Sequence, residues 1–493
     1  LLWFCENWKD HKTDYAGSVI TEPMIIVYAY TGDERLVKFS EDWLEWLGEH
    51  SKWQNTMEKY LSDKLPYGSM HVVAYGENFK HPALVYCATG EKRMLDASVN
   101  AANKALRRIV QTTGGASSCT EYLSPKGASN ETEYCNFSTF NHSYSWLALA
   151  TGKASWGDEM ERCLFNGAEG ARKKDEKAIA YFTAPNQNKA TRSSTLYGGI
   201  SDMGAYAPCY NVACCPAQSV RIIPEFVRSM CMEDEKGETY IYCYGPASVR
   251  SDAIDFEMET LYPFRETITL KVSRADSARL HLRIPAWCKA PSVKINGKDA
   301  GLLFDGDGFA LIDSAIVSGD SVEIFLPMEV KLVRVDDADS SSKFPIFIER
   351  GPLVYALNIP TAWSEYPGKP ITELPEGWAW YEAQPDIDSF APGVDQYIAC
   401  EHSPWSKAID EHLDPSRIRV TEHEPDGYVW ENPPITLEVP LYPVEHICIH
   451  HARGMYETWG GPLSPTGDTE YCTLVPHGCT NLRVTYIARA NVL

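Results

Sequence analysis

The sequence has no long hydrophobic run and no stripe of basic residues. No apolar stretch approaches the roughly 18 residues that cross a bilayer, so we expect a soluble chain without a membrane partner. The 45 Lys and Arg residues are outnumbered by 67 Asp and Glu residues, and the net charge is -22. Because nucleic acid phosphates are bound by clustered positive charge, nucleic acid is not expected as a partner. A neutral or weakly charged ligand fits this composition better.

Cysteine is present without the pattern of a disulfide framework. The 15 cysteines are an odd number, their spacing is irregular, and no C-x-x-C motif occurs. Disulfide frameworks favour short chains with even counts, so we expect free thiols, most of them buried and a few acting as ligands. The chain opens on LLWFCENWKD, which has the pattern of the middle of an amphipathic helix, and we expect further residues upstream. Any export signal would lie among them, so the compartment stays open.

The first 230 residues carry a phrase that occurs three times. Apolar helical patterns end at Thr-Gly in YAYTGDERLVKF (28–39), YCATGEKRMLDA (86–97) and LALATGKASWGDEM (147–160). Glycine adopts the left-handed conformation that closes a helix, so each phrase predicts the end of one helix and the start of another. Repeated helical hairpins stack into a solenoid or close into an α/α toroid with a central cavity, and we favour closure.

After about residue 232 the apolar period changes from that of a helix to that of a strand. Short runs such as ITLKVSRADSARLHLRI are separated by Gly, Asp, Asn and Pro turns, a pattern typical of a β-sandwich. A second β-rich section begins near residue 345 and finishes with NLRVTYIARA. We therefore predict a helical domain over 1–232, a β-sandwich over 233–344, and a second β-sandwich with long insertions over 345–493.

The stretch NVACCPAQ places two cysteines side by side ahead of a proline. Proline is favoured in the first turn of a helix, so Cys214 and Cys215 are predicted at a helix N-terminus, where the macrodipole favours thiolate. Upstream, NETEYC contains Glu133 and Cys135 as an E-x-C pair. Three sulfurs and one carboxylate would complete a tetrahedral zinc site. By spacing alone the alternative stays open, because vicinal cysteines are often buried packing residues.

Several segments in combination carry a family resemblance. The E-x-C pair, CCP at a helix start, RIPAWCKAPSVKINGK (283–298), IERGPLVYALN (348–358) and LVPHGCTNLRV (474–484) together resemble glycoside hydrolase family 127, which is typified by β-L-arabinofuranosidases. The resemblance runs over nearly the whole chain. It implies an (α/α)6 toroid catalytic domain followed by β-sandwich domains.

The resemblance also implies a Zn²⁺ cofactor and roles for the residues that match the family's motifs. Cys214 would be the nucleophile, and Cys215, Glu133 and Cys135 would bind Zn²⁺ together with it. The family commonly reads CCPPN where this chain reads CCPAQ, so a contact beside the nucleophile is expected to differ.

Two further site residues follow from the resemblance. The segment SSCTEYLSPKG supplies Glu121 as the general acid/base, and YGSMHVVAYGE supplies His71 as a sugar contact. The thiolate of Cys214 would attack the terminal sugar of an oligosaccharide or polysaccharide substrate with retention of configuration. Glu121 would protonate the leaving oxygen and then deprotonate water.

Three other interpretations of the sequence stay open. In the first, the sugar is one of the unusual units taken by relatives, such as anhydrogalactose or aceric acid, in place of arabinofuranose. In the second, the zinc is purely structural, and the protein binds glycans without cleaving them. In the third, the chain is a metal-free helical-toroid hydrolase or lyase that uses two carboxylates, with the cysteines as packing residues.

Other acidic and imidazole groups of the helical domain are predicted to lie outside the site. Asp158, Glu159 and Glu161 in WGDEMERC have the pattern of a solvated helix face. His142, seven residues after Cys135, is a less favoured alternative zinc ligand.

Overall fold

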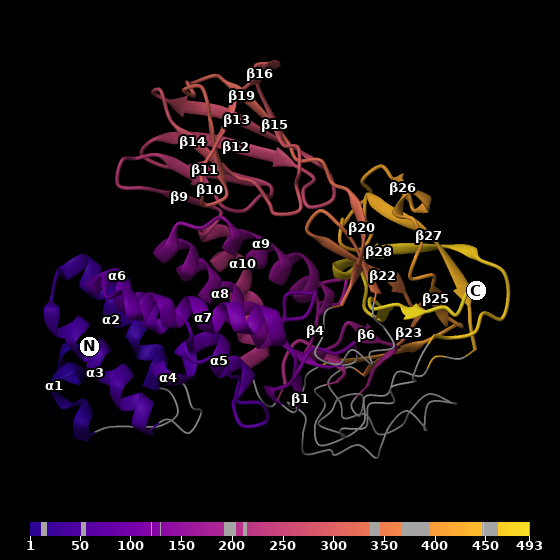
Figure 1. Ribbon diagram of the computed structural model, residues 1–493, viewed down its shortest axis with the longest axis horizontal. Coiled ribbons are helices and arrows are strands. Elements are labelled where there is room, and N and C mark those ends of the chain that lie inside the picture. The colour runs from indigo at the N-terminus through magenta and orange to yellow at the C-terminus, as the bar shows by residue number, and fades with distance from the viewer. Residues whose placement is uncertain are drawn as a thin grey trace.

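Helices fill the N-terminal part of the chain, and two β-rich parts follow it (Figure 1). This multidomain order of helices and then strands was predicted, and it is confirmed. No described helix is long and apolar enough to cross a membrane. The computed structural model describes residues 1–10, 17–50, 56–119, 121–128, 130–191, 204–210, 214–335, 346–366, 395–445, 447 and 462–492.

The helical part is built from pairs of helices joined by short turns. The helices α2 (Thr21–Thr31), α6 (His81–Thr89) and α8 (Tyr134–Thr151) are each capped by a glycine, with φ values of 67°, 72° and 67°. Only glycine adopts this left-handed conformation without strain, so the predicted helix ends at Thr-Gly are confirmed. The other helices of this part are α1 (Leu2–Asn7), η1 (Trp8–Asp10), η2 (Gly17–Ile20), α3 (Glu34–His50), α4 (Met57–Leu61), α5 (Val72–Asn78), α7 (Lys92–Arg108), α9 (Ser155–Arg162), η3 (Cys163–Ala168) and α10 (Cys214–Arg228).

The helix α8 lies at the centre of this part. Its side chains are buried on all sides over most of its length, and α5, α6, α9 and α10 pack around it. A helix covered in this way shows no separate polar face in its sequence, unlike the amphipathic helices at the surface. The helix α10 packs along α8, and the candidate site lies where these two helices begin.

The middle part forms two sheets that share one core. Its strands are β9 (Cys231–Glu233), β10 (Thr239–Ile241), β11 (Ala247–Arg250), β12 (Ile254–Thr260), β13 (Thr267–Ala275), β14 (Leu280–Arg283), β15 (Ser292–Ile295), β16 (Lys298–Ala300), β17 (Leu302–Phe304), β18 (Phe309–Ile312) and β19 (Ser321–Phe325). One sheet has the order β17-β18-β14-β10-β9 and the other β11-β12-β13-β19-β15-β16. Alternate side chains of β12 are buried against the facing sheet, which is the arrangement of a β-sandwich.

The C-terminal part is organised around a sheet of ten strands. The strands of this part are β20 (Val330–Arg334), β21 (Ile346–Arg350), β22 (Leu353–Asn358), β23 (Thr361–Tyr366), β24 (Gln396–Glu401), β25 (Lys407–Ile409), β26 (Arg419–Glu422), β27 (Ile435–Pro443), β28 (Glu470–Pro476), β29 (Arg483–Val484) and β30 (Ala488–Arg489), with the short helices η5 (Pro415–Arg417) and η6 (His477–Cys479). The main path of the sheet is β20-β21-β22-β28-β27-β25-β30.

Strands from the first 232 residues complete the sheets of the C-terminal part. These strands are β4 (Ile179–Ala180), β6 (Asn186–Gln187), β7 (Lys189–Ala190) and β8 (Tyr206–Ala207). The strand β6 pairs with β29, and β7 and β8 pair with β24. The sequence predicts only helices in this stretch, because strands of two residues are too short to show a period. The helical and C-terminal parts are therefore joined by backbone hydrogen bonds.

The prediction of a solvated face for WGDEMERC is wrong. Glu161 and Arg283 are both fully buried and form an ion pair, and Asp158 pairs with the same guanidinium. The hydroxyl of Tyr262 donates to Glu161, and the backbone N–H of Tyr244 donates to it at 3.1 Å. Because the middle sandwich covers α9, the acidic side of this helix faces a protein interface and not solvent.

We expect Glu161→Gln to destabilise the protein, because it leaves the buried Arg283 with only Asp158 as a charged partner. Breaking a buried ion pair costs about 3–5 kcal/mol, and because one charged partner remains, we expect a loss of about 3 kcal/mol. The measurement is the urea midpoint of unfolding, followed by tryptophan fluorescence. The control Glu257→Gln breaks the exposed pair of Glu257 with Arg250 and should cost less than about 1 kcal/mol. Equal midpoints for the two variants would contradict the expectation.

Candidate active site

Two helix N-termini meet at the candidate site. The strand β3 (Thr132–Glu133) pairs with β5 (Phe182–Thr183), and α8 begins directly after it, with Glu133 in an extended conformation at φ -71° and ψ 138°. Cys135 therefore lies in the first turn of α8. The helix α10 begins at Cys214, and Cys215 is buried in its first turn, as the Cys-Cys-Pro sequence predicted. Residues 211–213 of the NVACCPAQ stretch lie outside the described residues.

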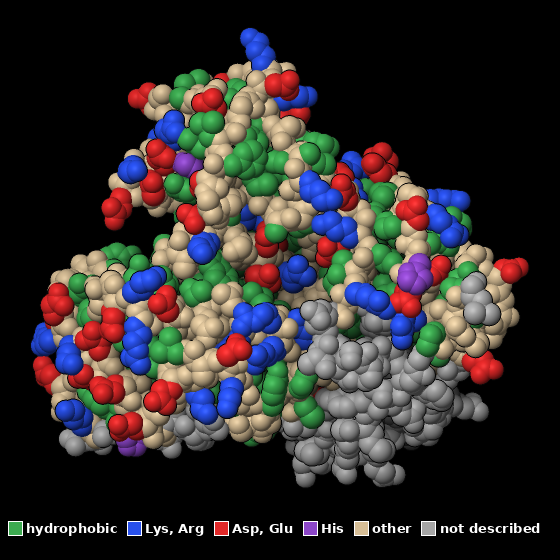
Figure 2. Space-filling model, viewed as in Figure 1, with side chains coloured by type: hydrophobic (Ala, Val, Ile, Leu, Met, Phe, Trp, Pro, Cys, Tyr) green, Lys and Arg blue, Asp and Glu red, His purple; other side chains and the backbone are tan. Residues whose placement is uncertain are grey.

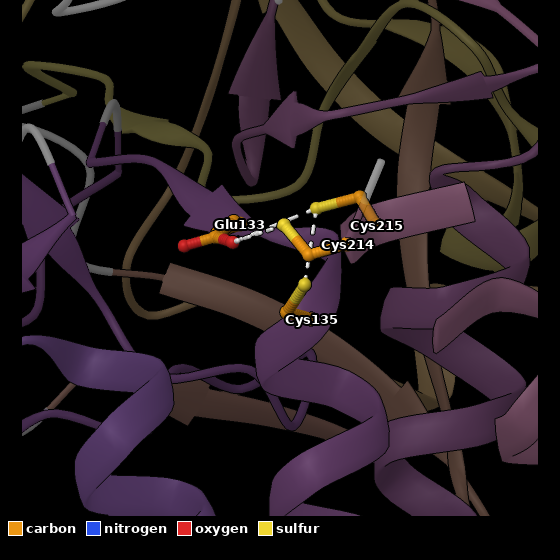
Figure 3. Close-up of side chains that lie close together, drawn as sticks. All are labelled: Glu133, Cys135, Cys214 and Cys215. Carbon is orange, nitrogen blue, oxygen red and sulfur yellow. Dashed lines mark hydrogen bonds between the residues drawn. The ribbon is translucent and has the colours of Figure 1, made fainter. Parts of the chain in front are cut away.

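The side chains of Glu133, Cys135, Cys214 and Cys215 converge on one point (Figure 3). The sulfurs of Cys135 and Cys215 are 3.3 Å apart, and Glu133 Oε1 lies 3.6 Å from the Cys215 sulfur and 3.8 Å from the Cys214 sulfur. All four ligand atoms lie within 4.8 Å of one another. With metal–ligand bonds of about 2.0–2.3 Å, the ligand atoms of a tetrahedral site lie roughly 3.4–3.8 Å apart, so the observed spacings suit such a site.

The burial of this cluster also suits a bound cation. Glu133 and Cys135 are each 1% exposed and Cys215 is 0% exposed, and Glu133 Oε2 has no hydrogen-bond partner. Burial, together with the neighbouring Cys214 and Glu121, raises the pKa of Glu133 well above its usual range. A buried carboxyl group surrounded by thiols lacks a compensating charge, and a metal ion would supply it. Three thiol sulfurs and one carboxylate oxygen are a donor set for a metal that accepts soft ligands.

Cys214 differs from the other two cysteines of the cluster in exposure and in pKa. It is exposed, whereas Cys135 and Cys215 are buried. The pKa of Cys214 is lowered because Cys135, Cys215 and the hydroxyl of Tyr181, 3.1 Å from its sulfur, donate hydrogen bonds to the thiolate. Burial raises the pKa of Cys135 and of Cys215. The arrangement therefore favours one accessible thiolate held by three donors.

Glu121 is held beside Cys214 by an unusual backbone conformation. It lies between β1 (Ser118–Cys119) and β2 (Tyr122–Leu123) with φ at 68°, a left-handed value that few residues other than glycine adopt. Its carbonyl accepts a hydrogen bond from the N–H of Val72 at 2.8 Å, and Oε1 lies 3.4 Å from the hydroxyl of Tyr181. The hydroxyl of Tyr181 thus stands between the carboxylate of Glu121 and the sulfur of Cys214. Backbone strain of this kind is frequent where a side chain must be aimed at a functional site.

His71 lies on the other side of Glu121. It caps α5, where Nδ1 accepts a hydrogen bond from the N–H of Ala74 at 3.3 Å. Its Nε2 consequently faces Glu121 Oε2 at 3.5 Å, and both side chains are about one-fifth exposed, at 22% and 23%. The predicted site residues are thus brought together, while their catalytic and binding roles stay predictions.

Tyr181 was not predicted as a site residue, and the less favoured prediction of His142 as a zinc ligand is wrong. The segment around Tyr181 contains no motif, and only the pairing of β3 with β5 brings its hydroxyl to the site. His142 lies two turns beyond Cys135 on α8, where its ring nitrogens face Glu225 at 2.5 Å and Glu22 at 2.7 Å. It is therefore outside the thiol cluster.

Models of two domains of one enzyme family match most of the helical and middle parts. Residues 10–228 match the "Beta-L-arabinofuranosidase, GH127 catalytic domain", and residues 238–328 match the middle domain of the same family. The chain belongs to glycoside hydrolase family 127. The resemblance noted from the E-x-C and CCP motifs is thus confirmed. The two matches cover the helices that carry the candidate site and the sandwich that covers α9.

A curated relative agrees with this assignment. A non-reducing end β-L-arabinofuranosidase of Bifidobacterium longum subsp. longum is 30% identical over 219 residues, which are 41% of this chain but only 32% of that protein. The chain thus aligns with about a third of the length of this curated relative.

Solved structures of glycoside hydrolases, two of them GH127 enzymes, share the fold of this chain. A glycoside hydrolase superposes with a TM-score of 0.72 at 16% identity and covers 99% of this chain and 78% of its own. A GH127 β-arabinofuranosidase gives 0.69 at 18% identity, covering 97% of this chain and 69% of its own. A GH127 β-L-arabinofuranosidase from Geobacillus stearothermophilus gives 0.61 at 16% identity, covering 95% and 71%. At these identities the likeness concerns the fold.

In the metal-free protein, we expect Cys214 to react with iodoacetamide at a lower pH than Cys87 does. The hydrogen-bond donors around its sulfur lower the pKa of Cys214, so its thiolate persists as the pH falls. Cys87 is an exposed residue for comparison, and partial burial of its thiol raises its pKa. Peptide mapping by mass spectrometry between about pH 5 and pH 9 gives the pH midpoint for each thiol, which is independent of differences in nucleophilicity.

Tyr181→Phe provides the matched control for this measurement. It removes one hydrogen-bond donor to the Cys214 sulfur, so the midpoint of Cys214 should move to higher pH while that of Cys87 stays unchanged. Labelling of Cys214 only at alkaline pH, together with Cys87, would show that the cluster does not stabilise its thiolate.

Proposed function

We propose that this GH127 chain is a retaining exo-glycoside hydrolase. It would remove terminal β-L-arabinofuranosyl units, or a related unusual sugar, from plant or algal oligosaccharides and polysaccharides. Cys214 would be the nucleophile, Glu121 the general acid/base, and His71 a contact to the sugar. The family membership and the geometry around Cys214 support this proposal.

The observation that carries the proposal is the position of Glu121 relative to Cys214. One hydroxyl group, that of Tyr181, lies within 3.4 Å of the carboxylate and within 3.1 Å of the sulfur. A retaining glycosidase requires its acid and its nucleophile about 5–5.5 Å apart, on opposite sides of the anomeric carbon. Glu121 and Cys214 are thus separated by a distance of the order that this chemistry needs, and both are accessible.

We further propose that Zn²⁺ is the resident metal and that Glu133, Cys135, Cys214 and Cys215 hold it. The spacing of the ligand atoms, the burial of Glu133 and its unpartnered Oε2 support a cation at this point. Zinc accepts three sulfurs and a carboxylate in a tetrahedral site, and when bound it keeps thiolates deprotonated near neutral pH.

The residues of the chain supply the two halves of the reaction. The sulfur of Cys214 forms a bond to the anomeric carbon as the bond to the leaving oxygen breaks, and protonated Glu121 gives its proton to that oxygen. In the second half, Glu121 takes a proton from water, and the water oxygen displaces the Cys214 sulfur. His71 faces Glu121 Oε2 with its Nε2, so it lies where it can orient the carboxyl group and contact a sugar hydroxyl.

We also propose that the helical part is an (α/α)6 toroid. Helices of successive pairs pack side by side, with α2 on α6, α6 on α8 and α8 on α10, which supports a ring of inner helices. In such a ring, the N-termini of α8 and α10, which carry the candidate site, would lie at one end, where a sugar could enter.

Two of the three alternatives from the sequence, the purely structural zinc site and the mechanism with two carboxylates, are less well supported. A mechanism with two carboxylates would pair Glu121 with Glu133, whose reacting groups lie within 4.8 Å of each other. Glu133 is 1% exposed and its Oε1 contacts two thiols, so it is poorly placed to reach a sugar. A purely structural metal site would not require an accessible Cys214 or an acid beside it.

The first test is hydrolysis of p-nitrophenyl β-L-arabinofuranoside by the wild type, Cys214→Ser and Glu121→Gln. We expect Cys214→Ser to abolish turnover, and Glu121→Gln to lower kcat by roughly 10²–10⁴-fold, because a general acid/base contributes about that much. The defect of Glu121→Gln should be larger on an alkyl glycoside, whose leaving group needs protonation, than on the nitrophenyl glycoside. Cys163→Ser, a buried thiol that donates to the carbonyl of Gly114, serves as the control.

The outcomes separate the proposals. Activity of Cys214→Ser close to that of the wild type would overturn the thiolate mechanism. No turnover of this substrate by the wild type, with turnover of glycosides of another sugar, would keep the mechanism and change the sugar. Binding of glycans without cleavage of any glycoside would favour the glycan-binding alternative.

A second test is the metal content. We expect about one Zn²⁺ per chain in the wild type, and a clear fall after dialysis in Cys135→Ser, because a site with three protein ligands holds zinc less tightly than one with four. Inductively coupled plasma mass spectrometry measures it, again with Cys163→Ser as the control. Equal zinc in Cys135→Ser and the wild type would place the metal elsewhere.

A further inference from the structure

A pocket of about 240 Å³ lies where the helical part meets the C-terminal β part. It is bounded by the end of α7 and the loop after it, by α9, and by β20 and β21. Figure 2 shows the surface hollowed at this junction, with Lys and Arg as well as Asp and Glu side chains around the hollow. The volume is below the roughly 300–1,000 Å³ of sites for drug-sized ligands, so the pocket has room for a single ring. None of its lining residues belongs to the candidate active site.

Two residues that line this pocket each have a buried side-chain oxygen without a hydrogen-bond partner. These oxygens are Gln111 Oε1 and Thr112 Oγ1, on residues that are 1% and 9% exposed. Gln111 Nε2 donates to the carbonyl of Asn130 at 2.9 Å, which fixes the orientation of the amide. The N–H of Thr112 donates to the hydroxyl of Tyr486 at 3.1 Å. Because unpaired buried oxygens are costly, a ligand that offers hydroxyl donors here would be bound favourably.

The charge of the pocket is mainly positive. Among its described lining residues, Lys126, Arg162 and Arg334 are basic and Glu159 alone is acidic. Arg162 donates to the carbonyl of Thr112 at 3.3 Å and lies 3.8 Å from Glu159. Arg334 pairs with Glu411 outside the lining, so only the remaining N–H groups of its guanidinium are offered to a ligand. With three basic lining residues against one acidic, an anionic group would be attracted to this pocket.

The pocket also has an aromatic wall. The rings of Phe347 and Tyr486 both line it, with centroids 6.0 Å apart and planes tilted by 59°. Aromatic rings next to a few fixed polar groups are the usual lining of a small-molecule site, and they suit the C–H faces of a sugar ring. A free phosphate or sulfate ion would satisfy the positive charge but would leave the aromatic wall and both acceptor oxygens unused.

We propose that this pocket binds a single uronic acid unit, as a glycan site separate from the candidate active site. The carboxylate of the sugar would lie at Arg162 and Arg334, its hydroxyls would donate to Gln111 Oε1 and Thr112 Oγ1, and its ring would pack on Phe347. The inference does not rest on the proposed hydrolysis, because the two sites share no residue.

The test is calorimetric titration of the protein with D-galacturonate, and with D-galactose as the same ring without the carboxylate. We expect galacturonate to bind at least about tenfold more tightly than galactose, since a hydrogen bond to a charged group contributes about that factor. Thr112→Val and Arg334→Gln should each weaken galacturonate binding by about fivefold to tenfold. Both variants are mild, because the first preserves shape and the second changes a side chain that is 62% exposed.

Two control variants match these changes away from the pocket. Thr239→Val also removes a buried hydroxyl without a hydrogen-bond partner, and Arg35→Gln also removes an exposed and paired guanidinium. Both should bind galacturonate as the wild type does. The proposal is overturned if the wild type does not bind galacturonate, if the pocket variants bind it as tightly as the controls, or if inorganic sulfate competes as strongly as galacturonate.

Discussion

The parallel packing of α8 against α10 is the contact on which the candidate site depends. Both helices start at the same point, where the sulfurs of Cys135 and Cys215 are 3.3 Å apart, and both are joined again further along, where His142 lies 2.5 Å from Glu225. Two contacts along one helix pair fix both its direction and its register. The positive ends of two helix dipoles then point at the same cluster, which favours thiolates and a carboxylate there.

The charges along this helix pair are balanced in two different ways. Two turns from the thiol cluster, the ring nitrogens of His142 face the carboxylates of Glu22 and Glu225, at 2.7 Å and 2.5 Å. Lys80, which is fully buried, contacts Glu22 at 3.4 Å and Glu77 as well. The hydrogen bond with His142 and the charge of Lys80 lower the pKa of Glu22, and the charges of Lys80 and Arg221 lower the pKa of Glu77. At the helix N-termini no such side-chain cation accompanies Glu133 among the interactions of the described residues, and a metal ion fits that deficit.

The β parts hold the helical part in place and do not merely follow it in sequence. Arg283 of the middle sandwich is bound between Asp158 and Glu161 of α9, and the strands β4, β6, β7 and β8 join the sheets of the C-terminal part. The same stretch positions the site, since β5 pairs with β3 just before α8 and sets Tyr181 beside Cys214. The pocket between α9, β20 and β21 is a further product of this junction.

Signals that act within a few residues were readable from the sequence. The Thr-Gly steps ended helices at Gly32, Gly90 and Gly152, the change of period marked the β parts, and proline marked the helix start at Cys214. What depends on contacts between distant segments was decided only by the tertiary structure. A two-residue strand has no period, and an acidic helix face looks the same whether water or a buried arginine covers it. The sequence therefore could not predict the place of Tyr181, the burial of Glu161 or the separation of His142 from the thiols, because each depends on how the helices and sheets pack.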